Sequence, residues 1–163
     1  MKAATLLLYF FLCSAIVSAQ YTAASISGYT NGSNVTYIDP LTGSLETRFA
    51  GLLNGRLIDT STGPAVSYYF LDAKIPLGYN LPRNDYFDDI ISDGIDRHAC
   101  WIINNFYPGD TATGQLSDLN LEASAIQFAI WHFTSGIQLN TITNPTIRNR
   151  ALEIQNMAAN NAC

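Results

Sequence analysis

The sequence predicts an α+β fold in which a β-rich first half packs against a helical second half. The first half is rich in β-branched and aromatic residues, and pairs of turn-forming residues interrupt it. The second half repeats apolar residues at the spacing of a helix. Strands that precede helices, without alternation of the two, are typical of α+β folds. We therefore expect an antiparallel, sandwich-like set of strands packed with three to four helices.

The first nineteen residues have the pattern of a secretory signal peptide. Lys2 supplies a positive start, Ala3–Val17 an apolar run, and Ser18 and Ala19 a small-residue cleavage site before Gln20. The apolar run is too short to span a bilayer comfortably. We expect residues 1–19 to be removed and the protein to be secreted, with no membrane insertion.

The remainder, residues 20–163, is expected to form a single domain, because no repeat, low-complexity tract or linker divides it. The whole chain has eight Lys and Arg against thirteen Asp and Glu, a formal net charge of −5. This negative balance disfavours nucleic acid and anionic lipid surfaces. We expect neither as a partner.

Four segments of the first half have the composition of strands. Asn-Gly, Asp-Pro and Gly-Pro pairs lie between them and predict turns. The segments are "SISGYT" (25–30), "VTYI" (35–38), "FAGLLNGRLI" (49–58) and "AVSYYFL" (65–71).

The first predicted helix runs from about Ile95 to Phe106. It ends where Pro108 and Gly109 prevent a further turn. Its apolar residues recur at helical spacing and define one buried face: Ile95, Ala99, Ile102 and Phe106.

Two further helices are expected. One runs from about Asp118 to Thr134, with Ser117 or Asp118 as its N-cap and Gly136 just past its end. The other starts with Asn144 as cap and Pro145 in its first turn. Its apolar face is formed by Ile147, Ala151, Ile154 and Ala158.

The middle helix contains an unusual polar residue, Gln127, in the stretch "AIQFAIWHF". Almost no position from Ala123 to Phe133 is charged, so the helix is expected to be buried on nearly all sides. A buried amide without partners costs about 1–3 kcal/mol. Gln127 must therefore either bond to neighbouring groups or take part in chemistry.

Several motifs, in order along the chain, resemble the thioester domains, or TQXA domains, at the tips of Gram-positive surface adhesins. "AIQFAIW" is similar to the family pattern apolar–Gln–x–x–apolar–Trp, which would place Trp131 at the tryptophan. The resemblance covers roughly residues 28–161. Its other motifs are "FAGLLNGRL", "SYYFLD", "PLGYN", "HACWIINNFYP", "WHFTSGIQLN" and the last predicted helix.

The resemblance implies a specific covalent chemistry. In the family, a cysteine thiolate displaces ammonia from the glutamine amide and forms an internal thioester. An amine of the target then attacks the acyl carbon and expels the thiolate, which leaves adhesin and target joined by an amide. The protein is consumed once, so this is acyl transfer without turnover and not enzyme catalysis. The resemblance implies no cofactor.

This chain departs from the family at the nucleophile. Aligning "YYFLD" with the family's Tyr-Cys-apolar-Asp motif places Tyr69 at the tyrosine, Phe70 at the cysteine and Asp72 at the acid. Phenylalanine has no nucleophilic atom, so a thioester between Phe70 and Gln127 cannot form. Gln127 is then expected to be a hydrogen-bonded core amide.

The two cysteines outside the leader leave alternatives open. Cys100 and Cys163 are candidates for a disulfide in an oxidising compartment. A bond to another chain and two free thiols are the other possibilities. Cys100 is also an alternative nucleophile for a thioester with Gln127, provided that the two predicted helices face each other there.

Other candidate sites are weaker. His98 and His132, with Cys100 and Asp96, suggest a Cys–His hydrolase or a zinc site, but the usual metal-binding spacings are absent from the sequence. We expect no metal. Asn31 and Asn34 begin two sequons for N-linked glycosylation.

Together these observations predict a secreted thioester-domain-like protein that binds an extracellular protein or surface ligand and has lost covalent capture. The alternative is a covalent adhesin that uses Cys100 and Gln127. A secreted hydrolase or metal-binding protein is the third possibility.

Overall fold

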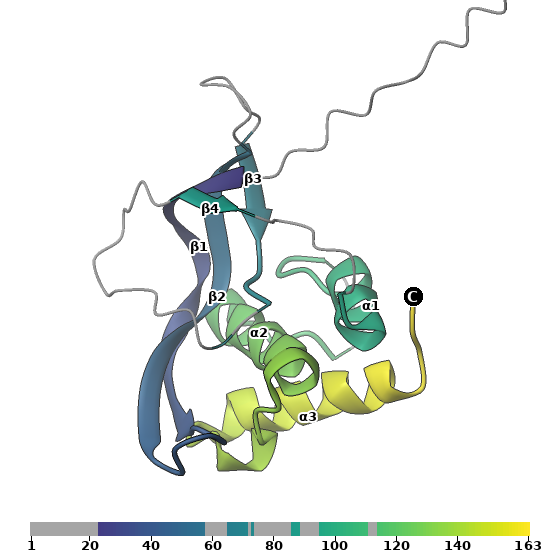
Figure 1. Cartoon of the computed structure of the whole chain (residues 1–163). Coiled ribbons are helices and arrows are strands. Elements are labelled where there is room, and N and C mark those ends of the chain that lie inside the picture. The colour runs from purple at the N-terminus through teal and green to yellow at the C-terminus, as the bar shows by residue number, and fades with distance from the viewer. Residues whose placement is uncertain (1–22, 58–64, 72, 74–85, 89–94, 111–113) are drawn as a thin grey trace, which may run out of the picture.

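One antiparallel sheet, three α-helices and a short 3₁₀ helix make up the described part of the computed structural model. The described residues are 23–57, 65–71, 73, 86–88, 95–110 and 114–163 (Figure 1). This confirms the predicted α+β class. The predicted signal peptide lies outside the described residues.

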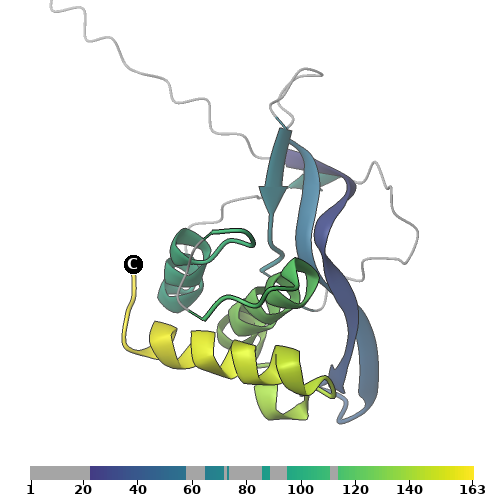
Figure 2. The same ribbon diagram turned by 180° about the vertical axis from the view of Figure 1, so that it is seen from behind.

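The sheet contains four strands in the order β3-β2-β1-β4, and every pairing is antiparallel. The strands are β1 (Ala23–Ile38), β2 (Leu45–Leu57), β3 (Ala65–Tyr68) and β4 (Tyr86–Asp88). The described strands form a single sheet and not the two facing sheets of a sandwich. Helices, instead of a second sheet, cover its inner face (Figures 1 and 2).

β1 joins two segments that the sequence placed in separate strands. The Asn31-Gly32 pair predicted a turn there, and this prediction is wrong, because β1 runs through it with register shifts near Gly28 and Thr30. The expected Asp-Pro turn is present after Ile38. In this turn Asp39 Oδ1 accepts a hydrogen bond from Leu41 N at 2.7 Å.

Gly32 and Gly51 are paired across the β1–β2 hairpin, and both have positive φ (149° and 157°). A Cβ atom at Gly51 would lie 2.5 Å from Gly32 Cα and would also overlap the carbonyl oxygen of Asn31. Because both contacts are with backbone, side-chain rotation cannot relieve them. This glycine pair therefore lets the two strands approach closely beneath the helices.

Three α-helices and one 3₁₀ helix follow the strands: α1 (Arg97–Asn105), α2 (Leu119–Ser135), η1 (Leu139–Thr141) and α3 (Pro145–Ala159). Asp118 caps α2 by accepting hydrogen bonds from Asn120 N and Leu121 N, and Gly136 ends it in the left-handed conformation. Asn144 caps α3 as expected. None of the helices in the described residues is long and apolar enough to cross a membrane.

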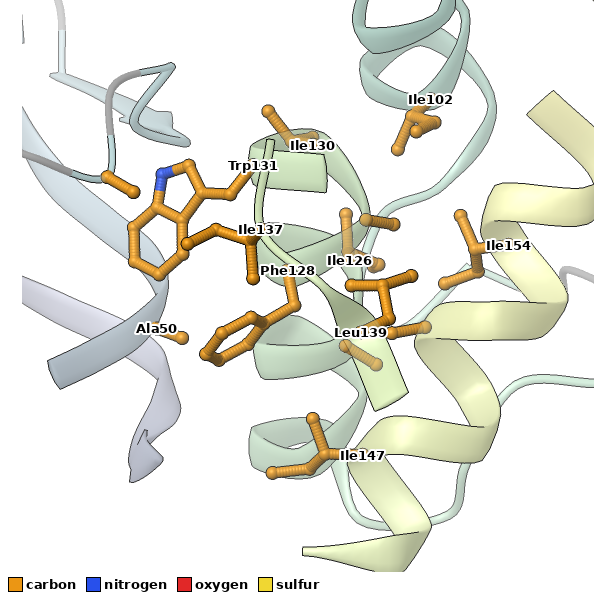
Figure 3. Close-up of a cluster of buried hydrophobic side chains, with 14 of the residues drawn as sticks. Ala50, Ile102, Ile126, Phe128, Ile130, Trp131, Ile137, Leu139, Ile147 and Ile154 are labelled. Carbon is orange, nitrogen blue, oxygen red and sulfur yellow. The ribbon is translucent and has the colours of Figure 1, made fainter. Parts of the chain in front are cut away.

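α2 is the centre of the fold. It lies against the sheet, and α1 and α3 pack on its other sides (Figures 1 and 2). Every residue from Glu122 to Trp131 is buried, which confirms the expected burial of this helix. Figure 3 shows Phe128 and Trp131 on its sheet side, near Ala50, and Ile126 toward Ile154 of α3. The ring of Phe128 meets that of Tyr37 edge-on at 5.2 Å.

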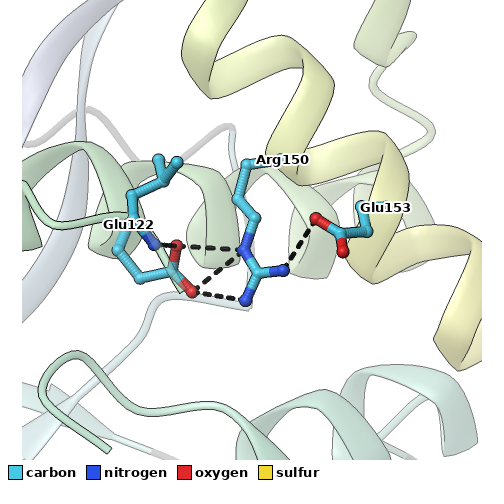
Figure 4. A network of polar contacts seen from close by, with 4 residues as sticks. Glu122, Arg150 and Glu153 are labelled. Atoms are coloured by element: carbon cyan, nitrogen blue, oxygen red, sulfur yellow. Dashed lines mark hydrogen bonds and ion pairs between the residues drawn. The ribbon is translucent and has the colours of Figure 1, made fainter. Parts of the chain in front are cut away.

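A buried ion pair fixes α3 on α2 (Figure 4). Arg150 and Glu122 have side chains only 1% and 2% exposed, and Arg150 Nη2 lies 2.9 Å from Glu122 Oε1. Arg150 Nε also donates to Glu122 Oε2 at 3.0 Å, which makes the pair bidentate. Arg150 Nη1 contacts the more exposed Glu153 at 2.8 Å. Two charges can be buried here because their hydrogen bonds satisfy each other.

Replacing Gly51 with alanine should destabilise the hairpin, because the new Cβ meets backbone atoms at a φ of 157°. We expect a loss of about 2–3 kcal/mol in the free energy of unfolding, measured by urea denaturation. Gly28→Ala is the matched control, since no atom lies within 4 Å of its Cβ position. Equal effects of the two variants would contradict this account of the glycine pair.

Arg150→Met should cost about 3–5 kcal/mol of stability, because it leaves the Glu122 carboxylate buried without its partner. The control is Glu153→Gln, which removes an ion-pair partner whose side chain is 48% exposed. That variant should lose less than about 1 kcal/mol. Thermal denaturation of both would test the difference, and a mild effect of Arg150→Met would rule out a structural role for the buried pair.

Candidate functional site

Gln127 lies in the middle of α2 and contacts the backbone of Phe70, in the segment that follows β3. Gln127 is only 1% exposed. Phe70 N donates to Gln127 Oε1 at 3.1 Å, and Gln127 Nε2 donates to Phe70 O at 2.6 Å. The two residues that the sequence assigned to the thioester motif are therefore direct neighbours.

The hydrogen bonds give both ends of the Gln127 amide a partner. The side chain pairs with the backbone of Phe70 much as an adjacent strand would, with one donor and one acceptor on each side. An amide placed in this apolar helix is thus satisfied, as expected of a core glutamine.

Two more side chains of α2 hold the same segment. Thr134 Oγ1 donates to the carbonyl of Leu71, and Ala73 N donates to Ser135 Oγ at 3.1 Å. Together with Gln127 they bind the backbone at residues 70, 71 and 73. The segment after β3 is consequently fixed along α2 by side-chain hydrogen bonds to its backbone.

The side chain of Phe70 belongs to the core beside Gln127. It is 8% exposed and packs in the core, with its ring 6.2 Å from that of Tyr68. The Phe70 side chain contains only carbon and hydrogen, so it has no group that could attack the carbonyl carbon of the Gln127 amide.

Tyr69 precedes Phe70 in the chain, Trp131 lies one helical turn after Gln127, and each has a buried polar atom. The Tyr69 hydroxyl and Trp131 Nε1 have no hydrogen-bond partner in the part of the chain that the structure describes. Burial raises the pKa of Tyr69, and nearby Tyr107 and Glu122 raise it further. The phenol therefore stays neutral at physiological pH and cannot act as a base there. Asp72, the fourth predicted motif residue, lies outside the described residues.

The two cysteines of the helical half are bonded to each other. Cys100 and Cys163 form a disulfide with their Cα atoms 6.0 Å apart, which confirms the predicted pairing. Arg97 Nε also donates to the carbonyl of Cys163 at 2.8 Å, so the last residue is held against α1. With its sulfur in the disulfide, Cys100 has no thiol for the alternative thioester with Gln127. The predicted alternative, a thioester between Cys100 and Gln127, is therefore wrong.

The two histidines have different partners in the described structure. His98 stacks on Phe133 with ring centroids 4.7 Å apart, and its Nδ1 lies 3.3 Å from Asp96 Oδ1. His132 Nδ1 instead contacts the carbonyl of Ile137 at 2.8 Å. Among the described residues, no group of three His, Cys, Asp or Glu side chains is placed to hold a metal ion.

The buried Glu122–Arg150 pair was not predicted from the sequence, and neither were the bonds of Thr134 and Ser135 to the segment after β3. Arg150 shares the apolar face of α3 with Ile147 and Ile154, and this position was the available signal for a buried charge. Glu122, at the start of the otherwise uncharged α2, was the matching signal. Thr134 and Ser135 gave no such signal, because their partners are backbone groups.

Gln127→Leu should destabilise the protein by about 3 kcal/mol, since it removes two buried hydrogen bonds to the backbone of Phe70. Gln138→Leu is the control, because Gln138 is exposed and its side chain donates to the nearby Gly136 carbonyl, two residues away. Its effect should stay within about 0.5 kcal/mol. The measurement is chemical denaturation of both variants, and equal small losses would show that the Gln127 contacts carry no stability.

The comparisons with known proteins identify a family. A family model described as "Thioester domain" matches residues 58–160, which include the segment after β3 and all three α-helices. No curated protein and no solved structure matches the chain. On the strength of the family match, which spans more than half of the sequence, the chain belongs to the thioester-domain family.

Proposed function

We propose that this protein is a secreted, extracellular binding module of the thioester-domain family that holds its partner without covalent capture. Its action is binding and not catalytic turnover. The partner is an extracellular protein or surface ligand.

One observation carries the proposal: the Gln127 amide faces the backbone of Phe70, with hydrogen bonds of 3.1 Å and 2.6 Å. This contact supports the alignment that places Phe70 at the family's cysteine. A residue at position 70 is within reach of the amide, and here that residue has no sulfur. The hydrogen bonds also favour an intact amide over an acyl bond.

The bonding of the cysteines also supports an intact Gln127 amide. The chain has three cysteines. Cys13 belongs to the predicted signal peptide, and Cys100 and Cys163 are bonded to each other. No thiol of residues 20–163 therefore remains to attack Gln127, and thioester formation requires a thiolate.

Without a thioester, affinity must come from non-covalent contacts, and binding must be reversible. Primary amines should then have no effect on the protein, whereas they consume a working thioester. The prediction distinguishes this module from an adhesin that captures lysine side chains, and it does so without knowledge of the natural partner.

Intact-mass spectrometry tests the proposal. The secreted protein should show the loss of about 2 Da from the disulfide, and methylamine should not change its mass. Cyclisation of an N-terminal Gln20 would lose about 17 Da as well, but its lactam does not react with methylamine, unlike the ester of an acyl-transfer site. A Phe70→Cys variant places a thiol beside the Gln127 amide and should lose a further mass of about 17 Da, as ammonia leaves on acyl transfer. Methylamine should then add about 31 Da to that variant by opening the ester.

The matched control is Phe70→Cys combined with Gln127→Ala, which keeps the thiol and removes the amide. It should show neither change. A loss of about 17 Da in the unmodified protein that is followed by a gain of about 31 Da with methylamine would overturn the non-covalent proposal. Absence of the loss in a folded Phe70→Cys variant would contradict the placement of Phe70 at the nucleophile position.

A further inference from the structure

A small cavity lies between the turn of the β1–β2 hairpin and the C-terminal end of α2. Its volume is about 10 Å³, enough for one group of the size of a water molecule. Asp39, Pro40 and Leu41 of the turn line it. Ser135, the last residue of α2, and Ala73, in the segment after β3, line it as well. The cavity therefore joins the hairpin turn to the elements that hold the Gln127 site.

The turn places a buried carboxylate at this cavity. Asp39 is 9% exposed. Its Oδ1 accepts hydrogen bonds from the N–H groups of Leu41 and Thr42 at 2.7 and 3.4 Å. Its Oδ2 has no hydrogen bond within the described part of the chain. A buried carboxylate is stabilised by a cation or by further donors, so Asp39 can take one more partner.

The negative charge of Asp39 has no ion-pair partner among the described residues. Arg48 is bound elsewhere: its Nη2 and Nε lie 2.7 and 2.8 Å from Glu46 Oε2, and its Nη1 donates to the carbonyl of Ala73. The charge of Glu46 is thereby matched, whereas that of Asp39 is not. Because Ser135 ends α2, the partial negative charge of the helix C-terminus adds to that of Asp39.

Exposed aliphatic side chains lie around the same turn. Leu41, which lines the cavity, is 68% exposed. Ile38 and Leu45 flank the turn, are also exposed, and are paired in register across β1 and β2. Figure 1 shows the turn at the free end of the two long strands. This end of the hairpin therefore combines an unpaired negative charge with accessible apolar surface.

We propose that the cavity binds the ammonium group of a lysine of an extracellular protein partner, as an ion pair with Asp39, while the aliphatic part of that lysine packs on Leu41. The inference rests on the proposed function, because it names the chemistry that a non-covalent partner presents. A primary ammonium is a compact charge that suits a cavity of this size, whereas the planar guanidinium of arginine is larger. The formal net charge of −5 also favours a basic partner.

The ion pair forms without a covalent step and does not involve the Gln127 amide. It places one point of partner recognition at the hairpin turn, where an exposed rim leads to a buried charge. Lysine is distinguished here by its charge and by the small size of its head group, and not by the reactivity of its nitrogen.

Titration with n-butylammonium tests the site, because this ion has the chain and head group of a lysine side chain. ¹⁵N NMR at low ionic strength should show saturable shifts of the amide signals of Leu41, Ser135 and Ile137. n-Butanol, which has no charge, and n-butylguanidinium, whose head group is larger, should bind at least about tenfold more weakly. Equal affinity for either of them overturns the assignment to lysine. Absence of n-butylammonium binding, with water alone in the cavity, overturns the proposal.

Asp39→Asn tests the role of the charge, since it keeps a side-chain oxygen for the N–H groups of Leu41 and Thr42. It should weaken n-butylammonium binding at least about tenfold. Asp110→Asn is the matched control, because Asp110 is an exposed carboxylate between α1 and α2 and should leave the affinity unchanged. Unchanged affinity in a folded Asp39→Asn variant overturns the proposal.

The comparison of the three probes uses the unmodified protein and so does not depend on the folding of a variant. Intact-mass spectrometry reports only on Gln127 and the cysteines. A failure of the lysine site is therefore distinguished from a failure of the proposed function.

Discussion

The burial of α2 on all sides is the constraint on which the rest of the structure depends. A polar side chain in a helix so placed costs free energy unless it finds a partner. Each of its three buried polar residues does so with a different element. Ser124 bonds to the β1–β2 hairpin, Gln127 to the segment after β3, and Glu122 to Arg150 of α3. These contacts set the position of the sheet, of the connecting segment and of the last helix around α2.

The same constraint accounts for the character of the candidate site. On the proposed alignment of Phe70 with the family's cysteine, a thioester would join the segment after β3 to α2 through an acyl bond. In this chain, two hydrogen bonds between Gln127 and the Phe70 backbone connect the same two elements. On the proposed function, the site is therefore a structural link between sheet and helix. Binding then depends on the protein surface, where a partner can be held and released.

The sequence predicted those features that depend on local chemistry. The caps at Asp118 and Asn144 and the burial of α2 follow from side-chain type and helical spacing, and the structure confirms them. The contact between Phe70 and Gln127 could be expected only from the family resemblance, because the two residues are far apart in the chain. The turn predicted at Asn31-Gly32 was wrong, because a glycine with positive φ also occurs where two paired strands approach closely. The Glu122–Arg150 pair depends on how two helices pack, which spacing within one helix does not determine.

The central claim is that Gln127 is an intact amide locked onto the backbone of Phe70. NMR of ¹⁵N-labelled protein tests it most directly, because a side-chain NH₂ group gives its own pair of signals. We predict an NH₂ pair for Gln127 that exchanges slowly with water and shows nuclear Overhauser effects to Phe70, whereas the exposed Gln138 exchanges rapidly. Absence of an NH₂ pair for Gln127, or exchange as rapid as that of Gln138, would contradict the account.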